Sequence, residues 1–162
     1  MLYLPSSNTN KFIKQMSSQK YITNSADDTR MVGENFAKKL KPGDFIALFG
    51  ELGGGKTTFT QGLVRGLGIK KRIISPTFII LREYKIPDNT GNFYHIDLYR
   101  INIEEHEVPE LGLDDIINEK KDIVLVEWAE KMGDNLPKNR WEVNFEYIDD
   151  DKRQIIIKKI ND

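Results

Sequence analysis

The sequence predicts a three-layer α/β fold with a mainly parallel central sheet and antiparallel hairpin additions. Two short apolar runs without polar alternation, residues 45–49 and 123–126, are typical of strands buried on both faces of a parallel sheet. Apolar residues at helical spacing flank the first run on both sides. Helices that alternate with buried strands indicate layers of helices around a sheet.

The helices have recognisable ends. The first is expected to begin after a cap at Ser25 or Asp27 and to stop before Pro42-Gly43. The second follows the first buried run and ends at Gly68, a residue type that favours helix C-termini. A short third helix is expected over residues 113–118.

Two pairs of β-rich runs account for the antiparallel additions. Residues 78–84 and 92–99 are separated by the turn-forming sequence PDNTGN, which predicts a β-hairpin. Residues 141–160 predict two further strands around an Asp-rich turn.

Composition limits the class of protein. The chain has 162 residues, which predicts one domain, and 39% of them are hydrophobic, enough for a core of that size. Its formal net charge of -1 indicates that any contact with nucleic acid is local or made through a partner. The absence of cysteine excludes a disulfide framework, thiolate zinc sites and a cysteine nucleophile.

The domain boundary is expected near residue 20. Residues 1–20 are polar and contain Pro5, so they predict a flexible leader, and residues 21–162 predict a single domain. The sequence contains neither an apolar run of signal-peptide length nor 18 consecutive apolar residues. We therefore expect a cytoplasmic protein that does not contact a membrane.

The strongest motif is a glycine-rich loop. The sequence GELGGGKT, residues 50–57, satisfies G-x-x-x-x-G-K-[ST] between a buried strand and an amphipathic helix. Glycines let backbone N–H groups turn toward phosphate oxygens, and the helix adds its positive dipole end. Lys56 is expected to reach the β- and γ-phosphates, and Thr57 to bind Mg²⁺ through its hydroxyl. The predicted nucleotide contacts in this loop are Gly50, Glu51, Leu52, Gly53, Gly54, Gly55, Lys56, Thr57 and Thr58.

A phosphate loop of this kind also needs an acid that helps to hold the Mg²⁺. Glu127 follows the second buried run, and parallel strands would bring its end to the edge that carries the loop. Asp97 competes for this role, because alternation in HIDLYR places His95, Asp97 and Tyr99 on one face. Asp97 is alternatively a group that orients or deprotonates the attacking water, and His95 is equally compatible with capping a carbonyl.

Three further features have both a functional and a structural interpretation. Thr77, in SPTF, lies where many phosphate-loop switches place a threonine that senses the γ-phosphate, but it also fits an ordinary turn after Pro76. Trp128 either lines the nucleotide cleft or fills the core. The basic run at residues 70–72 is either a solvated loop or an RNA contact.

Together the motifs resemble a known family. GELGGGKTTFTQGLVRGLG, SPTF, HIDLYR, ELGL and VEWAEK, in this order and at these intervals, resemble the bacterial ATPase of tRNA threonylcarbamoyladenosine biosynthesis. The resemblance extends from about Ser25 to the C-terminus. It implies a P-loop fold and a small Mg²⁺-dependent ATPase that works with the threonylcarbamoyl transferase subunit and its paralogous partner subunit. Such a protein supports modification of the adenosine next to the anticodon, and it serves tRNA indirectly.

The resemblance also implies residue roles. Lys56 matches the phosphate-binding lysine of the family, and Thr57 and Glu127 match its Mg²⁺ ligands. Asp97 matches a functional aspartate and Thr77 the threonine of the SPT motif, so Asp97, Lys56 and Thr77 are the expected catalytic residues. Thr29 falls where similar proteins approach the adenine, and we add Thr29 and Trp128 to the expected ATP contacts.

Two other functions use the same loop. A small-molecule kinase usually adds an arginine-rich lid, whereas the arginines of this chain are scattered. A GTPase is expected to carry an N-K-x-D motif, which the sequence lacks. A docking switch that binds ATP without hydrolysing it needs the same loop, metal and acid as a slow ATPase.

Overall fold

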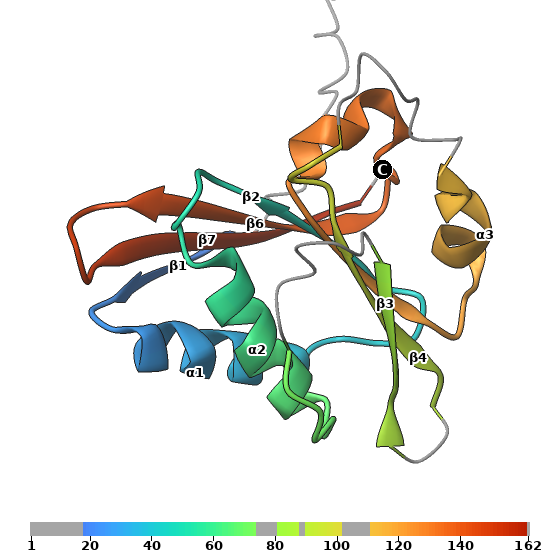
Figure 1. The fold of residues 1–162 in the computed structure, drawn as a ribbon, viewed down its shortest axis with the longest axis horizontal. Helices are drawn as coiled ribbons and strands as arrows, with labels where there is room; N and C mark the ends of the chain where they lie inside the picture. The colour runs from blue at the N-terminus through green and yellow to red at the C-terminus, as the bar shows by residue number, and fades with distance from the viewer. Residues whose placement is uncertain (1–17, 74–80, 88–89, 102–110, 162) are drawn as a thin grey trace, which may run out of the picture.

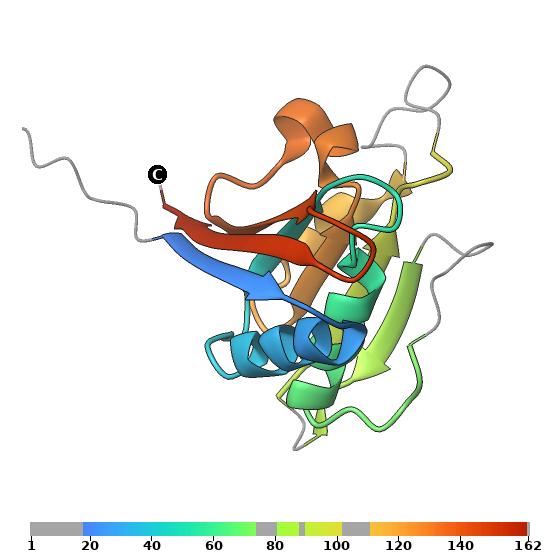
Figure 2. The same ribbon diagram turned by 90° about the vertical axis from the view of Figure 1, so that its left-hand side faces the viewer.

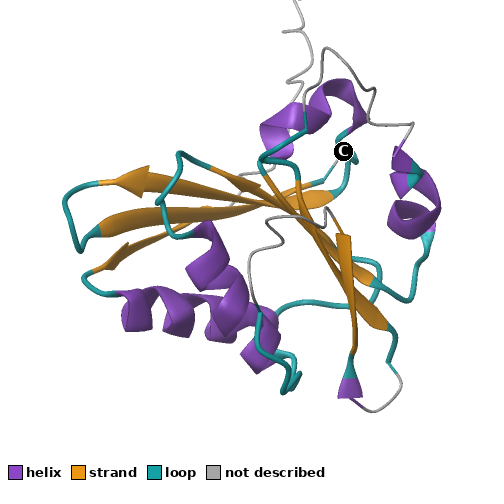
Figure 3. Ribbon diagram, viewed as in Figure 1, coloured by secondary structure: helices purple, strands orange, loops and turns teal. Residues whose placement is uncertain are grey.

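The computed structural model describes residues 18–73, 81–87, 90–101 and 111–161. The strands are β1 (Ser18–Thr23), β2 (Phe45–Phe49), β3 (Leu81–Lys85), β4 (Asn92–Asp97), β5 (Ile123–Glu127), β6 (Arg140–Tyr147) and β7 (Arg153–Ile160). Within the described residues they form one sheet of seven strands in the order β1-β7-β6-β2-β5-β4-β3 (Figure 1). Helical segments lie on both sides of this sheet, which gives the three expected layers (Figure 3).

The sheet is evenly mixed. Strand β2 pairs in parallel with β5 and β6, and β4 pairs in parallel with β5. The pairs β1–β7, β6–β7 and β3–β4 are antiparallel. Both predicted hairpins are therefore confirmed, and the four central strands β6, β2, β5 and β4 are parallel as predicted, although the sheet as a whole is mixed. The additional antiparallel pairing comes from β1, which joins β7 at one edge of the sheet (Figure 2).

Strand β1 was not predicted. It begins at Ser18, inside the segment expected to be a leader, so residues 18–20 belong to the sheet. Five of its residues are exposed or half-buried, and only Thr23 is buried. An edge strand that buries so little lacks the apolar pattern by which a strand is predicted. Residues 1–17, the rest of the expected leader, lie outside the described residues.

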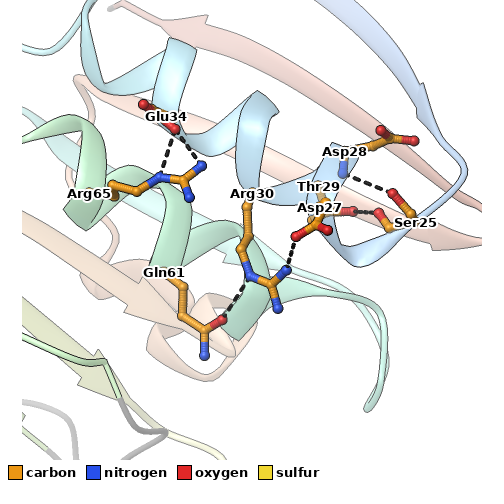
Figure 4. A network of polar contacts seen from close by, with 8 residues as sticks. All are labelled: Ser25, Asp27, Asp28, Thr29, Arg30, Glu34, Gln61 and Arg65. Carbon is orange, nitrogen blue, oxygen red and sulfur yellow. Dashed lines mark hydrogen bonds and ion pairs between the residues drawn. The ribbon is translucent and has the colours of Figure 1, made fainter.

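Two helices, α1 (Ala26–Ala37) and α2 (Lys56–Gly66), lie side by side on one face of the sheet (Figures 1 and 2). Of the two predicted caps, Ser25 is the N-cap of α1, and its Oγ accepts a hydrogen bond of 3.0 Å from the backbone N–H of Asp28 (Figure 4). Phe36 of α1 and Phe59 of α2 are buried against the sheet. This layer holds the glycine loop against one end of the central strands.

Glycines permit the close packing of α1 on α2. A Cβ atom at Gly62 would lie 1.9 Å from the carbonyl oxygen of Arg30, and one at Gly33 would lie 2.2 Å from that of Phe59. Both conflicts are with backbone atoms, so neither can be relieved by turning a side chain. The two positions fix the distance between the helices.

We expect Gly62→Ala to lower the free energy of unfolding. Alanine favours a helix over glycine by about 1 kcal/mol, but overpacking against backbone typically costs about 1–3 kcal/mol or more and should dominate at a 1.9 Å approach. Urea unfolding measures the difference. Met31→Ala is the control, because Met31 lies on α1 and is 57% exposed. A Gly62→Ala protein as stable as this control would contradict the close contact.

The opposite face is covered by α3 (Leu113–Asn118) and the 3₁₀ segment η3 (Ala129–Asn135). Ala47 and Val126 of the central strands are completely buried on this side. Helix α3 has the predicted bounds. Among the described residues, no helix combines the length and the apolar character needed to cross a membrane.

Candidate functional site

The glycine loop joins β2 to α2 at the carboxyl end of the parallel strands. Gly50, Gly53 and Gly55 have φ values of +141°, +76° and +101°, a region that favours glycine. Gly50 also lies so close to β6 that a Cβ atom would be 2.7 Å from the carbonyl oxygen of Phe145. The N-cap of α2 is Gly55, and no side chain of the described residues caps the first turn of this helix. The first backbone N–H groups of the helix are thus available to an anion.

Lys56 curls back over the loop that precedes it. Its Nζ donates hydrogen bonds to the carbonyl oxygens of Gly50 and Glu51, the latter at 2.8 Å. The same Nζ lies 4.1 Å from the ring centroid of Trp128, a cation–π contact. Backbone carbonyls and an aromatic face therefore hold the Lys56 ammonium over the loop.

The charge on Lys56 is only partly compensated. Burial lowers the pKa of the Lys56 ammonium from its ordinary value, and the carboxylates around it, Glu127 foremost, act in the opposite direction. Lys56 is only 5% exposed. A bound phosphate would add negative charge beside this buried cation and favour its charged form.

Trp128 has an unusual backbone conformation. Its φ of 59° is the one positive value at a residue other than glycine in the described part of the chain. This left-handed conformation costs a bulky residue about 1–3 kcal/mol and is typical of functional sites. It turns the chain directly after β5, so that the indole faces both Lys56 and the ring of Tyr99, whose centroid is 5.1 Å away. Trp128 thus lines the cavity beside the loop.

Glu127 ends β5 next to the loop, as parallel geometry predicts. In register it lies beside Leu48 of β2 and Asp97 of β4. Its side chain is almost completely buried, and its Oε2 accepts a hydrogen bond of 3.1 Å from the Thr57 hydroxyl. The second carboxylate oxygen, Oε1, accepts hydrogen bonds from His95 Nε2 at 2.8 Å and from the Thr60 hydroxyl at 3.4 Å. Glu127 is therefore held in one orientation from both sides.

Part of the loop, the first turn of α2 and the side chains of Glu127 and Trp128 line one cavity of about 210 Å³. Asp97 and Glu127 enter it from neighbouring strands, opposite the first turn of α2. Asp97 Oδ1 also accepts a hydrogen bond of 2.9 Å from the backbone N–H of Tyr99. The lining comprises Leu52, Gly53, Gly54, Gly55, Lys56, Thr57, Thr58, Asp97, Tyr99, Glu127 and Trp128. Gly50 and Glu51 lie behind this surface, where their carbonyl oxygens hold Lys56.

The oxygen atoms in the cavity suit Mg²⁺. Carboxylate and hydroxyl oxygens are its preferred protein ligands, and it commonly keeps several waters. Within the described ranges, no three His, Asp or Glu side chains are arranged to hold a metal ion by themselves. A Mg²⁺ that also binds phosphate oxygens and water needs only one or two protein ligands, and the adjacent oxygens of Thr57 and Glu127 fit that requirement.

Besides Gly50 and Glu51, the predicted ATP contact Thr29 does not line this cavity. The Thr29 hydroxyl is buried and hydrogen-bonds with the Thr23 hydroxyl at 2.9 Å and with the Ser25 carbonyl oxygen at 3.2 Å. Thr29 instead lines a second, smaller hollow of about 150 Å³ behind the loop, together with Thr58. Thr77 lies outside the described residues.

Two residues that contribute to the candidate site were not assigned this role from the sequence. Arg153 of β7 donates hydrogen bonds to the Gly53 carbonyl from Nε at 3.3 Å and Nη2 at 3.1 Å, which ties the C-terminal hairpin to the loop. No sequence signal marks this arginine, because 100 residues separate the partners. His95 was placed on the correct face by alternation, but its contact with Glu127 depends on the strand order.

We expect His95→Phe to lower the free energy of unfolding by about 1–3 kcal/mol, because the buried Glu127 carboxylate loses a hydrogen-bond donor. His95 Nδ1 has no hydrogen-bond partner among the described residues, so the contact through Nε2 accounts for the polar role of the ring. Thermal unfolding measures the loss. His95→Gln, which keeps a donor, should recover part of it, and equal stability of His95→Phe and wild type would contradict this role.

The fold and the site together define an α/β protein in which a glycine-rich loop and an acidic strand end meet at one edge of a mixed sheet. A family model described as "Threonylcarbamoyl adenosine biosynthesis protein TsaE" matches residues 23–155. The chain belongs to this family, whose members take part in the biosynthesis of threonylcarbamoyladenosine in tRNA.

Individual relatives agree with this assignment. The tRNA threonylcarbamoyladenosine biosynthesis protein TsaE of Bacillus subtilis (strain 168) is 39% identical over 140 residues, which cover 86% of this chain and 85% of the relative. The protein of the same name from Rickettsia bellii is 41% identical over 140 residues, covering 86% and 94%. The crystal structure of Bacillus subtilis YdiB superimposes with a TM-score of 0.74 at 32% identity, covering 91% of this chain and 88% of that one.

Proposed function

We propose that this chain binds ATP and Mg²⁺ and hydrolyses ATP slowly in support of tRNA threonylcarbamoylation. It acts with the threonylcarbamoyl transferase subunit and the paralogous partner of that subunit, and it serves tRNA through them. The hydrogen bond of 3.1 Å between Thr57 and Glu127 is the observation that carries the proposal. It joins the last residue of the phosphate-loop motif to the acid at the neighbouring strand end, which is the pairing that a Mg²⁺-dependent nucleotide site requires.

The phosphate groups would lie against the first turn of α2. The uncapped N–H groups of this turn, together with the positive end of the helix, favour an anion there. Lys56 is close enough to exchange its bonds to the Gly50 and Glu51 carbonyls for phosphate oxygens. Thr57 and Glu127 would hold Mg²⁺, which supplies positive charge to the phosphates in the transition state.

Asp97 is the residue best placed to act on the attacking water. It lies beside Glu127 in the strand register and lines the same cavity. Its Oδ1 accepts a hydrogen bond from the backbone N–H of Tyr99, which fixes the carboxylate in place. A carboxylate fixed near the phosphates can orient a water molecule and accept its proton. Trp128 and Tyr99 cover one side of the cavity and reduce the access of bulk water.

The test measures binding and turnover separately on the isolated chain. Titration with ATP, with and without Mg²⁺, gives the affinity, and phosphate release gives the rate. Saturable Mg²⁺-dependent binding with slow phosphate release supports the proposal. Tight binding without phosphate release, also in the presence of the partner subunits, would favour the docking switch, and phosphorylation of an added metabolite would favour a kinase.

A further inference from the structure

A second hollow, of about 730 Å³, lies along the later half of α2 and the residues that follow it. We call it the basic groove. Its rim carries five cationic side chains, and no acidic residue is among its described lining residues. The rim consists of Arg30, Arg65, Lys70, Lys71 and Arg72.

Two of the cations are held by neighbouring side chains (Figure 4). Arg30 forms an ion pair of 2.5 Å with Asp27 and a hydrogen bond of 3.4 Å with Gln61. Arg65 of α2 pairs with Glu34 of α1 through Nε at 2.7 Å and Nη2 at 2.5 Å. Such pairs hold the guanidinium groups on the rim but leave part of each exposed.

Among the residues that the structure describes, the other three cations have no such partners. Lys70, Lys71 and Arg72 are exposed, and none forms an ion pair or a side-chain hydrogen bond with another residue in the described ranges. The negative end of α2 does not explain them, because the helix ends at Gly66 and its dipole acts mainly within the last turn. In a chain with a net charge of -1, this is a local excess of positive charge.

The floor of the groove distinguishes between possible anionic partners. Val64, Ile69 and Ile73 line it, and no aromatic side chain does so among the described residues. Proteins that bind single-stranded RNA usually stack bases on aromatic side chains. An aliphatic floor inside a charged rim is instead the anatomy of a protein–protein interface, in which apolar contacts lie at the centre and complementary charges at the edge.

We propose that the basic groove docks an acidic, partly apolar segment of a partner protein in the tRNA modification machinery. Carboxylates of the segment meet Lys70, Lys71 and Arg72, and its apolar side chains cover the aliphatic floor. Helix α2 links the groove to the nucleotide site, since its first turn faces the cavity and its later turns line the groove. The inference depends on that part of the proposed function in which the chain acts with partner subunits, and it does not depend on ATP hydrolysis.

The test uses the full chain together with the purified transferase subunit and the paralogue of that subunit, all from the same organism. The variant Lys70→Glu/Lys71→Glu/Arg72→Glu reverses these three exposed charges. The control Lys120→Glu/Lys121→Glu/Lys138→Glu makes the same change in net charge at exposed lysines away from the groove. Binding to the subunits is measured by calorimetry at low and high salt, an unmodified tRNA transcript is titrated in parallel, and ATP affinity is measured for each isolated variant.

We expect the reversed variant to bind the subunits at least tenfold more weakly, with a smaller salt dependence, while the control stays within about twofold of wild type. ATP affinity of the isolated chain should be unchanged, so failure of docking and failure of the nucleotide site are separable. Equal binding by wild type and the reversed variant, or no binding of either subunit by wild type, would overturn the proposal. Direct tRNA binding that only the reversed variant loses would overturn it in favour of an RNA site.

Discussion

Replacing Lys56 with alanine should reduce ATP affinity by about a hundredfold or more and make phosphate release undetectable. The replacement removes the one cation of the loop. A charge-assisted contact to phosphate contributes about 1.5–3 kcal/mol to ATP binding. Hydrolysis additionally loses the stabilisation that this cation gives the transition state. Calorimetric titration and a phosphate-release assay measure both effects. The fold should tolerate the change, because burial already lowers the pKa of this ammonium and so disfavours its charged form.

The control for Lys56→Ala is Lys120→Ala, which removes an exposed lysine before β5. This variant should bind and hydrolyse ATP like wild type. Thermal unfolding without nucleotide distinguishes a damaged site from a damaged fold: the Tm of Lys56→Ala should match that of wild type. ATP affinity within twofold of wild type in Lys56→Ala would contradict the assignment of this lysine.

The buried elements of the fold could be predicted because their signals are local. The runs at β2 and β5 are apolar without alternation, helix α1 begins after the capping residue Ser25, and both hairpins have turn residues between their strands. Strand β1 could not be predicted in this way. It is stabilised by pairing with β7 at the far end of the chain, and its own side chains bury little apolar surface.

The site was predictable to the extent that a motif or a strand end marks it. Residues 50–57 carry the loop motif, and Glu127 follows a buried strand, so both could be named from the sequence. The contact of Glu127 with His95 could not, because it depends on β4 lying next to β5 in the sheet. The same holds for Arg153, whose position over Gly53 depends on the path of the C-terminal hairpin.

The mixed sheet also positions the residues of the candidate site. The four central strands are parallel, so their carboxyl ends present Glu127 and Asp97 to the loop from adjacent positions. The antiparallel hairpin β6–β7 then closes the other side of the loop, where Phe145 packs close to Gly50. Loop geometry therefore depends on elements from both sides of β2 in the sheet order.

Replacing Glu127 with glutamine should reduce hydrolysis about a hundredfold while ATP still binds weakly. Glutamine keeps the shape of the side chain and an acceptor for Thr57, but it removes the negative charge expected to hold Mg²⁺. We expect the Mg²⁺-dependent gain in ATP affinity to fall at least tenfold and phosphate release about a hundredfold, while affinity measured without Mg²⁺ stays close to that of wild type. Titrations at several Mg²⁺ concentrations separate the metal effect from the nucleotide effect.

The control is Glu142→Gln, which removes a carboxylate of similar burial in β6 that pairs with Arg140 and Lys158 instead of facing the cavity. Burial raises the pKa of Glu142, but its bonds to Lys158 and Arg140 outweigh burial and lower the value, so its loss should reduce stability at neutral pH without changing turnover. Glu127→Ala is a harsher variant, since it also leaves the buried His95 without its partner. Unchanged phosphate release in Glu127→Ala would remove Glu127 from the metal site and leave Asp97 as the acid.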